Sequence, residues 1–474
     1  MKNLICVIFT LIFLTACGQK NVNGTTSKQQ EIISDTTTKI VSKLKLNPGD
    51  LIQRINCIGN ENLNFAVYIP KGYNADIKMP ALFLFDPHAD GLLPLKMYRD
   101  LADEYNYILI GSNDSKNGNS RDRTSEILNS ILKSAYQLLP IDSERIYAGG
   151  FSGGARVASM LAFSSAKVQG LITCGAGFPQ DVWIKTPPSC IVGIAGDGDM
   201  NLNELTSLKV ENPDLKNRYQ VIRFDGKHEW PPMAIFEQAF LALEASAIHD
   251  SVIANDPVLI KHINDTYQSY ADSLTVSGNT LYEAGLYDRW IKSMDALVDL
   301  TVAKNTYKDL LKKASYKQAQ NDEQALFLEE QKRREFYISA IGKQDTIWWE
   351  QQMKNLQYEI KTSTIPKKNM LSRITGTLSL GCYMNLNQAI SANQRDPMEY
   401  LSHLYRILDP SNAEAWYLSA EVAGKKTDYP QVYNFLNRAV SLGFNDPNRA
   451  HNDPSFSMMM SDPEFNQIIN RNTK

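Results

Sequence analysis

The feature that most constrains this chain is a segment in which an expected strand turns directly into an expected helix. It runs from Arg145 to Leu161 and contains the pattern Gly150-x-Ser152-x-Gly154. A serine at such a turn is expected to be strained, because strand and helix come so close that a side chain at either flanking position would collide with the other element. Glycine at both flanks removes that collision. The pattern therefore predicts a sharp strand-turn-helix unit, here called the elbow, with a raised serine hydroxyl.

Ser152 is the candidate nucleophile of the elbow. Gly153 supplies a backbone N–H at the start of the helix, where it can face a developing oxyanion. A bare five-residue match also arises by chance in a chain of 474 residues, since strand-helix junctions often contain Gly and Ser. The context favours the catalytic interpretation, because a strand at Ile146–Gly149 and a helix with small residues at Ala155 and Ala158 lie where the motif requires them.

Strand and helix patterns alternate from residue 51 to residue 250. Strand signals begin at Leu51, and the expected strands are Leu63–Ile69, Ala81–Phe85, Tyr107–Ser112, Ile146–Gly149, Gly170–Cys174, Cys190–Ala195 and Tyr219–Phe224. The helices expected between them include Tyr98–Tyr105, Thr124–Leu139 and one that opens at Pro231-Pro232. This alternation predicts an α/β fold with an open, mostly parallel sheet and helices on both sides.

A serine hydroxyl is a poor nucleophile at neutral pH and needs a base that is itself oriented by an acid. His88 and His228 are the histidines of the alternating region before its last helix ends at His249. His228 is the candidate base, because it follows the last strand in a loop at the sheet edge where the elbow is expected. The alternative is a loop histidine near a helix end with no chemical role.

The candidate acid lies in Gly-Asp-Gly-Asp-Met-Asn, residues 196–201, after the strand that ends near Ala195. Asp197 and Asp199 are both available. We favour Asp199, because its spacing places the carboxylate one turn beyond the strand, where it can receive the imidazole N–H, whereas Asp197 can shape the turn.

The order Ser152, Asp199, His228 is that of the α/β hydrolases, and residues from about 63 to 249 resemble this family. The resemblance is to compact secreted esterases akin to feruloyl esterases and polyhydroxybutyrate depolymerases. Their run Asp-x-x-Arg-Ile-Tyr-x-x-Gly-x-Ser-x-Gly is matched by Asp142 through Gly154. The resemblance implies an α/β-hydrolase sheet and a Ser-His-Asp acyl transfer that uses no cofactor. The stretch between the strand ending at Cys174 and the strand beginning near Cys190 is short, where larger relatives insert a cap, so no large cap is expected.

One departure from these esterases concerns the second oxyanion donor. They commonly carry His-Gly after the third strand, whereas this chain has Asp-Pro-His-Ala-Asp-Gly at residues 86–91. Pro87 has no N–H, so the donor would be His88 or Ala89. Alternatively, His88 is a structural residue of this loop.

The first residues are expected to be a targeting signal. Met1-Lys2-Asn3 is a short positive start, and Leu4 to Leu14 is an apolar run too short for a stable membrane span. Leu-Thr-Ala-Cys at residues 14–17 resembles the end of a bacterial lipoprotein signal, which implies removal of residues 1–16 and acylation of Cys17. The alternative is an ordinary secretion signal with an incidental cysteine. Residues 17–50 are expected to be a flexible tether.

The other ligand classes are disfavoured by composition. Cys57, Cys174, Cys190 and Cys382 are scattered, with no C-x-x-C and no histidine at metal-ligand spacing, so neither a disulfide framework nor a zinc site is expected. The net charge of −3 and the lack of a basic run disfavour nucleic acid as a partner.

Beyond residue 250 the patterns are helical, and we divide them into a helical region at 251–370 and a second one at 371–474. Charges such as Glu329, Glu330, Lys332, Arg333 and Arg334 are interpreted as solvated faces. Residues 413–442 resemble one tetratricopeptide repeat through Trp416, Ala420, Asp428-Tyr429 and Ala439, and depart from it at Ser419, Val432 and Phe444. This half is expected either to cover the active site or to act as a separate docking arm.

These features predict an envelope-anchored serine hydrolase that cleaves carboxylic esters, on the periplasmic or the surface face. The expected substrate is an ester on a carbohydrate, a phenolic acid or a lipid, because an envelope enzyme meets these first. Peptide cleavage is the less favoured reaction of the same residues. The alternative is an inert hydrolase-like lipoprotein whose helical half binds an envelope protein or peptide.

Overall fold

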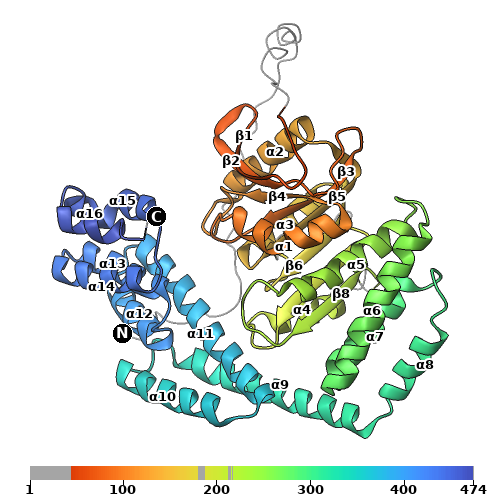
Figure 1. Ribbon diagram of the computed structural model, residues 1–474. Coiled ribbons are helices and arrows are strands. Elements are labelled where there is room, and N and C mark those ends of the chain that lie inside the picture. The colour runs from red at the N-terminus through yellow and green to blue at the C-terminus, as the bar shows by residue number, and fades with distance from the viewer. Residues whose placement is uncertain (1–43, 180–186, 212–214, 216, 473–474) are drawn as a thin grey trace, which may run out of the picture. The chain divides into compact units, whose positions relative to one another are not determined.

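The computed structural model describes residues 44–179, 187–211, 215 and 217–472 (Figure 1). The expected signal peptide, Cys17 as the expected lipidation site and most of the expected tether lie outside the described residues. The described residues from Asn47 onward belong to one unit.

An eight-stranded sheet forms the first part of this unit. Its strands are β1 (Leu51–Cys57), β2 (Asn60–Tyr68), β3 (Met79–Phe85), β4 (Ile108–Ser112), β5 (Ile141–Phe151), β6 (Val168–Cys174), β7 (Cys190–Gly196) and β8 (Tyr219–Phe224). Their spatial order is β1-β2-β4-β3-β5-β6-β7-β8. Strand β2 is antiparallel to β1 and β4, and the other pairs are parallel. This mostly parallel sheet confirms the predicted α/β-hydrolase fold class.

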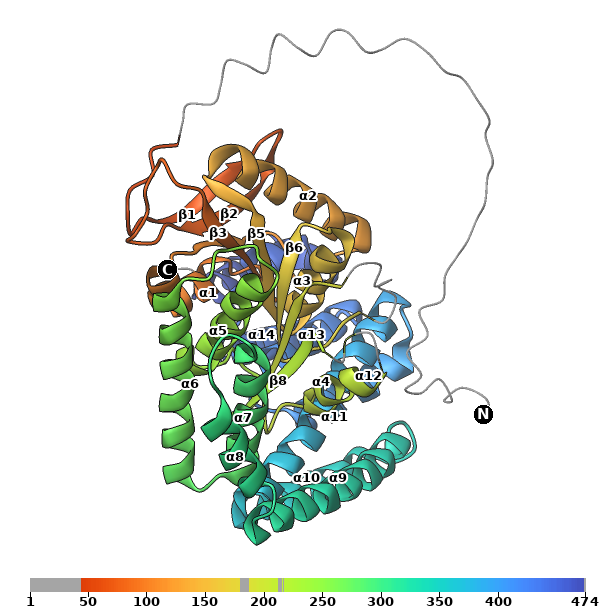
Figure 2. The ribbon, with the colours of Figure 1, turned by 90° about the vertical axis from the view of Figure 1, so that its right-hand side faces the viewer.

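Both faces of the sheet are covered, which explains the continuous apolar runs. All seven residues of β3 are buried. Leu82 and Leu84 belong to the core that lies under α1 (Leu92–Tyr105) and α5 (Met233–His249), and the alternate residues of the strand face the opposite side. Figure 2 shows α2 (Arg121–Leu138) and α3 (Gly153–Ser164) on one side of the strands and α5 on the other. A further helix, α4 (Leu202–Glu211), precedes β8.

The rest of the described chain is helical, as predicted. Its helices are α6 (Pro257–Ser277), α7 (Thr280–Met294), α8 (Thr301–Leu310), α9 (Ala314–Ala340), α10 (Thr346–Thr362), α11 (Ile365–Ser391), α12 (Arg395–Leu408), α13 (Ala413–Lys425), α14 (Tyr429–Ser441), α15 (Pro447–Asn452), a 3₁₀ helix (Pro454–Met459) and α16 (Pro463–Ile469). None of the helices within the described ranges is long and apolar enough to cross a membrane.

Helices α6 to α8 share one hydrophobic core with the sheet. Ile263 and Tyr267 of α6, Trp290 of α7 and Leu310 of α8 are buried in the same cluster as Leu82 of β3. The hydrophobic core of the sheet therefore extends to Leu310, about sixty residues beyond His249. The predicted domain limits themselves stay a prediction.

A second core lies within α9 to α16. Its largest fully buried side chains include Trp349, Tyr417 and Phe456. Helices α13 and α14 pack against each other as a hairpin. The resemblance of this hairpin to a tetratricopeptide repeat stays a prediction.

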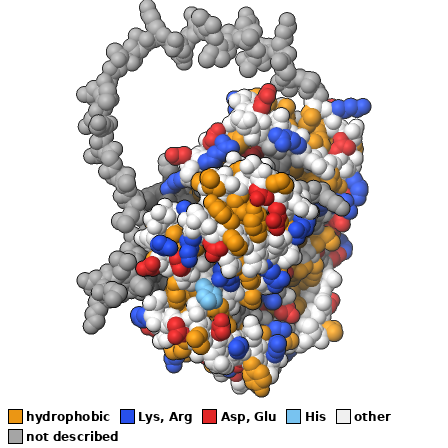
Figure 3. Space-filling model, turned by 90° about the vertical axis from the view of Figure 1, so that its left-hand side faces the viewer, with side chains coloured by type: hydrophobic (Ala, Val, Ile, Leu, Met, Phe, Trp, Pro, Cys, Tyr) orange, Lys and Arg blue, Asp and Glu red, His pale blue; other side chains and the backbone are white. Residues whose placement is uncertain are grey.

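On the face shown in Figure 3, acidic and basic side chains are interspersed with hydrophobic ones.

The interpretation of the charged residues of α9 as solvated is wrong for Glu330 and Arg334. Glu330, in the middle of α9, has no exposed side-chain surface, and Arg334 one turn later is mostly buried. The sequence pattern misled because α9 is covered by α11 on the side that carries these residues.

The shared core gives a test of the packing of α6. Ile263→Ala is expected to lower the free energy of unfolding by about 2–5 kcal/mol, because the isoleucine is fully buried and its loss leaves a cavity. Val276→Ala, on the same helix but 90% exposed, is the control and is expected to change it by less than about 0.5 kcal/mol. Urea unfolding followed by circular dichroism measures both. Equal stability of the two variants would show that α6 is not part of this core.

Candidate active site

The candidate site lies at the carboxyl ends of the parallel strands. Three connections meet there: residues 86–91 after β3 (the Asp86 loop), residues 197–201 after β7 (the acid loop) and residues 225–232 after β8 (the base loop). The elbow between β5 and α3 stands among them. Ligand sites of open parallel sheets form at this edge.

The elbow has the strained geometry expected from its sequence. Ser152 has φ 52° and ψ −120°, which is rare for a residue with a side chain. A Cβ atom on Gly150 would lie 2.3 Å from the carbonyl oxygen of Gly154, and one on Gly154 would lie 1.9 Å from the carbonyl oxygen of Phe85. Both flanks must therefore be glycine, because the elbow presses against its own helix and against β3.

The structure brings Ser152, His228 and Asp199 together. The Nε2 atom of His228 lies 2.9 Å from Oγ of Ser152, and its Nδ1 lies 3.0 Å from each carboxylate oxygen of Asp199. With Nδ1–H donated to Asp199, the free lone pair of Nε2 accepts the serine hydroxyl. The His228 side chain is 23% exposed, whereas the Asp199 side chain is 1% exposed. The site thus has an accessible imidazole held by a buried carboxylate.

Asp197 has other partners. Its carboxylate accepts from Nε of Arg223 at 2.8 Å and from the hydroxyl of Tyr282 at 2.9 Å. Of the two aspartates left open by the sequence, Asp199 is therefore the one that contacts the imidazole.

The Asp86 loop places both candidate second donors against Asp86. The N–H of His88 donates to the Asp86 carboxylate at 2.8 Å, and the N–H of Ala89 donates to the Asp86 carbonyl at 3.3 Å. Ala89 has φ 63°, so this turn is strained as well. Either N–H would have to leave Asp86 to reach an oxyanion. Gly153 differs, because it opens α3, where the first N–H groups have no partner within the helix.

Asp86 itself is a buried anchor of the site. Burial alone would raise the pKa of its carboxyl, but hydrogen bonds from His88 and Trp230 outweigh burial and hold this pKa below its usual range. The Trp230 bond is 2.9 Å long and joins the Asp86 loop to the base loop. The His88 side chain is largely exposed, and the Asp86 carboxylate, 3.6 Å from its Nδ1, raises the pKa of the imidazole.

Sequence reasoning missed Asn117, in the connection between β4 and α2. A Cβ atom on Gly153 would lie 1.8 Å from Oδ1 of Asn117, so this amide occupies the space beside the N-terminus of α3. A glycine at position 153, where a larger residue would also satisfy the motif, was the available signal.

Gly175 is a second residue that sequence reasoning missed. It has φ 64°, and a Cβ atom there would lie 2.7 Å from the ring of Phe151, 3.0 Å from Oδ2 of Asp199 and 3.2 Å from Cε1 of His228. The imidazole and its carboxylate therefore pack directly on this glycine. Its position right after β6, at the edge that carries the elbow, was the available signal.

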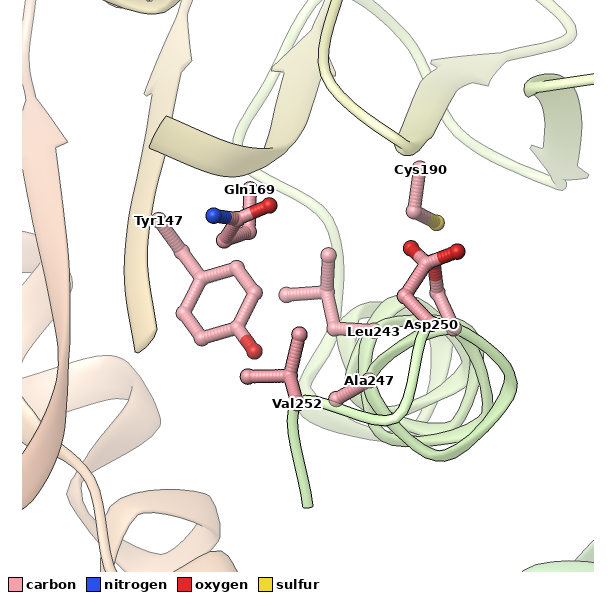
Figure 4. A pocket seen from close by; sticks show the side chains of 8 residues that line it. Tyr147, Gln169, Cys190, Leu243, Ala247, Asp250 and Val252 are labelled. Atoms are coloured by element: carbon pink, nitrogen blue, oxygen red, sulfur yellow. The ribbon is translucent and has the colours of Figure 1, made fainter. Parts of the chain in front are cut away.

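Two cavities of the described part lie away from these residues. One of about 10 Å³ is lined by Tyr147, Gln169, Cys190, Leu243 and neighbours at the opposite edge of the sheet (Figure 4). This volume holds one water molecule at most. A wider one of about 200 Å³ lies between α13 and the 3₁₀ helix. Neither can hold a substrate next to Ser152.

Comparison with known proteins gives similarity in structure only. No protein-family profile matches the chain, and no curated protein sequence matches it. Among solved structures, it is similar to an S-formylglutathione hydrolase from Staphylococcus aureus (15% identity, 43% of this chain, 98% of that one, TM-score 0.34). It is also similar to a ferulic acid esterase from Anaeromyces mucronatus (12% identity, 42% and 92%, TM-score 0.33). A third is an acylaminoacyl peptidase from Pyrococcus horikoshii, of which the chain spans 42% (15% identity, 44% of this chain, TM-score 0.31). The assignment of the fold rests on the strand order and the elbow.

The packing at Gly175 gives a test of the site geometry. Gly175→Ala is expected to lower the free energy of unfolding by about 2–4 kcal/mol. The alanine would have to adopt a positive φ, and its methyl group would make three contacts that are too close. Gly118→Ala is the matched control: φ is 88° there, with open space around the added methyl, so only the backbone cost of about 1 kcal/mol is expected. Urea unfolding measures both. Equal losses of unfolding free energy in the two variants would mean that the added methyl group at position 175 does not clash with its neighbours.

Proposed function

We propose that this protein is a serine hydrolase that cleaves carboxylic esters through Ser152, His228 and Asp199, and that it is anchored in a bacterial envelope through Cys17. The observation that carries the proposal is the hydrogen-bonded chain from Ser152 through His228 to the buried Asp199, on an elbow whose strain raises the serine. This constellation is recognised by its geometry rather than by its position in the sequence.

The reaction follows from the geometry. Oγ of Ser152 attacks the ester carbonyl while Nε2 of His228 takes its proton. Asp199 keeps Nδ1 protonated and stabilises the imidazolium that forms. The Gly153 N–H donates to the oxyanion at the positive end of α3. His228 then gives its proton to the leaving alcohol, which departs and leaves an acyl-Ser152. Water, deprotonated by His228, attacks this acyl group. The acid is released as His228 returns the proton to Oγ of Ser152.

The substrate class proposed is an ester of a carbohydrate, a phenolic acid or a lipid, and peptide cleavage is less favoured. The imidazole is 23% exposed, so the reacting atoms can be approached from solvent. Such access suits an ester that protrudes from a larger molecule.

A second candidate function has one observation in its favour. The N–H groups of His88 and Ala89 are both bonded to Asp86, so the second half of the oxyanion hole is not formed in this arrangement. An inert hydrolase-like protein that binds an envelope protein or peptide through its helical half would tolerate this. In the enzyme, the bonds would exchange when a substrate binds.

Labelling with a fluorophosphonate probe distinguishes the two functions. Wild-type protein is expected to be labelled and to hydrolyse short p-nitrophenyl esters, whereas Ser152→Ala is expected to lose labelling and to lose hydrolysis by several orders of magnitude. Ser164→Ala, at the exposed end of the same helix, is the control and is expected to behave as wild type. A wild-type protein with neither labelling nor hydrolysis would exclude the enzyme and leave the binding protein.

The proposed anchor is tested separately. In a bacterial host, the full chain is expected to partition with membranes and to incorporate a labelled fatty acid, because two or more acyl chains on one cysteine hold a protein at a bilayer. Cys17→Ala is expected to lose both, and Cys57→Ala, a buried thiol in β1, to lose neither. Secretion of a soluble wild-type chain would indicate an ordinary signal peptide instead.

A further inference from the structure

The acid loop is held by helices α9 and α11, far away in sequence. The guanidinium of Arg373, on α11, donates through Nη1 to the carbonyl of Asp197. That of Arg334, on α9, donates through Nη2 to the carbonyl of Met200 at 3.1 Å. The two bonds fall two residues before and one residue after Asp199, so they bracket the carboxylate that contacts His228.

A buried carboxylate joins the two arginines. Glu330 accepts from Nε and Nη2 of Arg373 at 2.8 and 2.6 Å, and its other oxygen lies 2.6 Å from Nη2 of Arg334. The Glu330 side chain is fully buried, and that of Arg373 is 10% exposed. Asn203, at the start of α4, adds a bond to Glu330 at 3.3 Å. Both arginines are thus fixed in position by the same anion.

Close packing reinforces these bonds. A Cβ atom on Gly376 of α11 would lie 3.2 Å from Cβ of Met200, and one on Gly198 would lie 3.6 Å from Cβ of Ser372. Helix α11 therefore rests directly on the acid loop.

On its other side the acid loop is bonded to the base loop. The N–H of Gly198 donates to the carbonyl of Gly226 at 2.8 Å, and that of Asp197 donates to the carbonyl of Phe224, at the end of β8, also at 2.8 Å. A displacement of the acid loop would therefore be felt at His228 as well as at Asp199.

We propose that Arg373, Arg334 and Glu330 form a clamp by which the helical half of the chain positions Asp199 against His228. They are positioning residues, since they act on the backbone of the acid loop. The expected effect on catalysis rests on the proposed function. The expected effect on the acid loop rests on the contacts alone. A buried ionic cluster adds little net stability compared with apolar side chains of the same size, so its value here lies in fixing geometry.

The decisive variant is Arg373→Met. It keeps an unbranched apolar stem, although a shorter one than that of arginine, and it leaves Glu330 paired with Arg334, one charge against one. The fold therefore has no unpaired buried anion to accommodate. We expect kcat for a p-nitrophenyl ester to fall roughly ten- to a hundredfold with KM within about twofold, because small displacements of catalytic groups cost rate rather than binding. Arg373→Lys, which retains one donor, is expected to recover part of the loss.

Arg333→Met is the matched control. Arg333 is the residue next to Arg334 on α9, but it forms a two-pronged pair with Glu359 of α10 at 2.7 and 2.8 Å. Its loss also removes a bidentate arginine–glutamate ion pair, but it leaves the contacts of the acid loop unchanged. We therefore expect kcat to stay within about twofold of wild type. Equal kcat values for Arg373→Met and Arg333→Met would overturn the proposal.

Hydrogen exchange over residues 197–201 tests the clamp without reference to activity. Faster exchange there in Arg373→Met, but not in Arg333→Met, is the expected result. Unchanged exchange overturns the clamp even in an active enzyme. A wild-type protein that is inactive, with exchange faster in Arg373→Met, would refute the proposed function and keep the clamp. If Arg373→Met fails to fold, Arg334→Met serves in its place, because it leaves Glu330 paired with Arg373 and removes the bond to the Met200 carbonyl. It is expected to lower kcat and to speed exchange over residues 197–201 in the same way.

Discussion

The strained backbone of Ser152 is the constraint on which the site depends. A left-handed conformation at a residue with a side chain costs about 1–3 kcal/mol, so neighbouring structure must hold it. Its N–H donates to the carbonyl of Cys174 at the end of β6, 2.8 Å away. On the other side, Gly154 touches the carbonyl of Phe85 at the end of β3. Both strands that flank β5 therefore fix the serine, and this is possible only because the sheet is parallel and its strand ends coincide.

The loops around the serine are bonded to one another as well as to neighbouring helices. Trp230 ties the base loop to Asp86, and Gly198 ties the acid loop to Gly226. Asn201 donates to the carbonyl of Gly175 at 2.7 Å, which joins the acid loop to the end of β6. The separations among Ser152, His228 and Asp199 are thus set by hydrogen bonds between these loops, made by side chains as well as by the backbone. A change in one loop cannot be absorbed locally.

Much of this could be predicted from the sequence, and the reasons are local. The buried strands have continuous apolar runs, and the elbow combines a motif with its strand and helix, so the fold and the order Ser152, Asp199, His228 are readable. The choice between Asp197 and Asp199 could be decided only from the hydrogen bonds of each carboxylate in the structure, because both residues lie in one turn. The burial of Glu330 was not readable either, since its partner Arg373 is 43 residues away and a charged run on a helix usually faces water. The extension of the sheet core into α6 to α8 was hidden because those helices are amphipathic like any surface helix.

The charges around the acid loop indicate what the helical half contributes to Asp199. Around this loop Arg373, Arg334 and Arg223 are bonded to Glu330, Asp197 and Glu323. Each of these guanidinium groups is therefore paired with a carboxylate other than that of Asp199. Two of them also donate to the carbonyls of Asp197 and Met200. An arginine placed for electrostatic effect would point at the carboxylate itself. These donate to the backbone on either side of it, and Asp199 itself contacts the imidazole of His228.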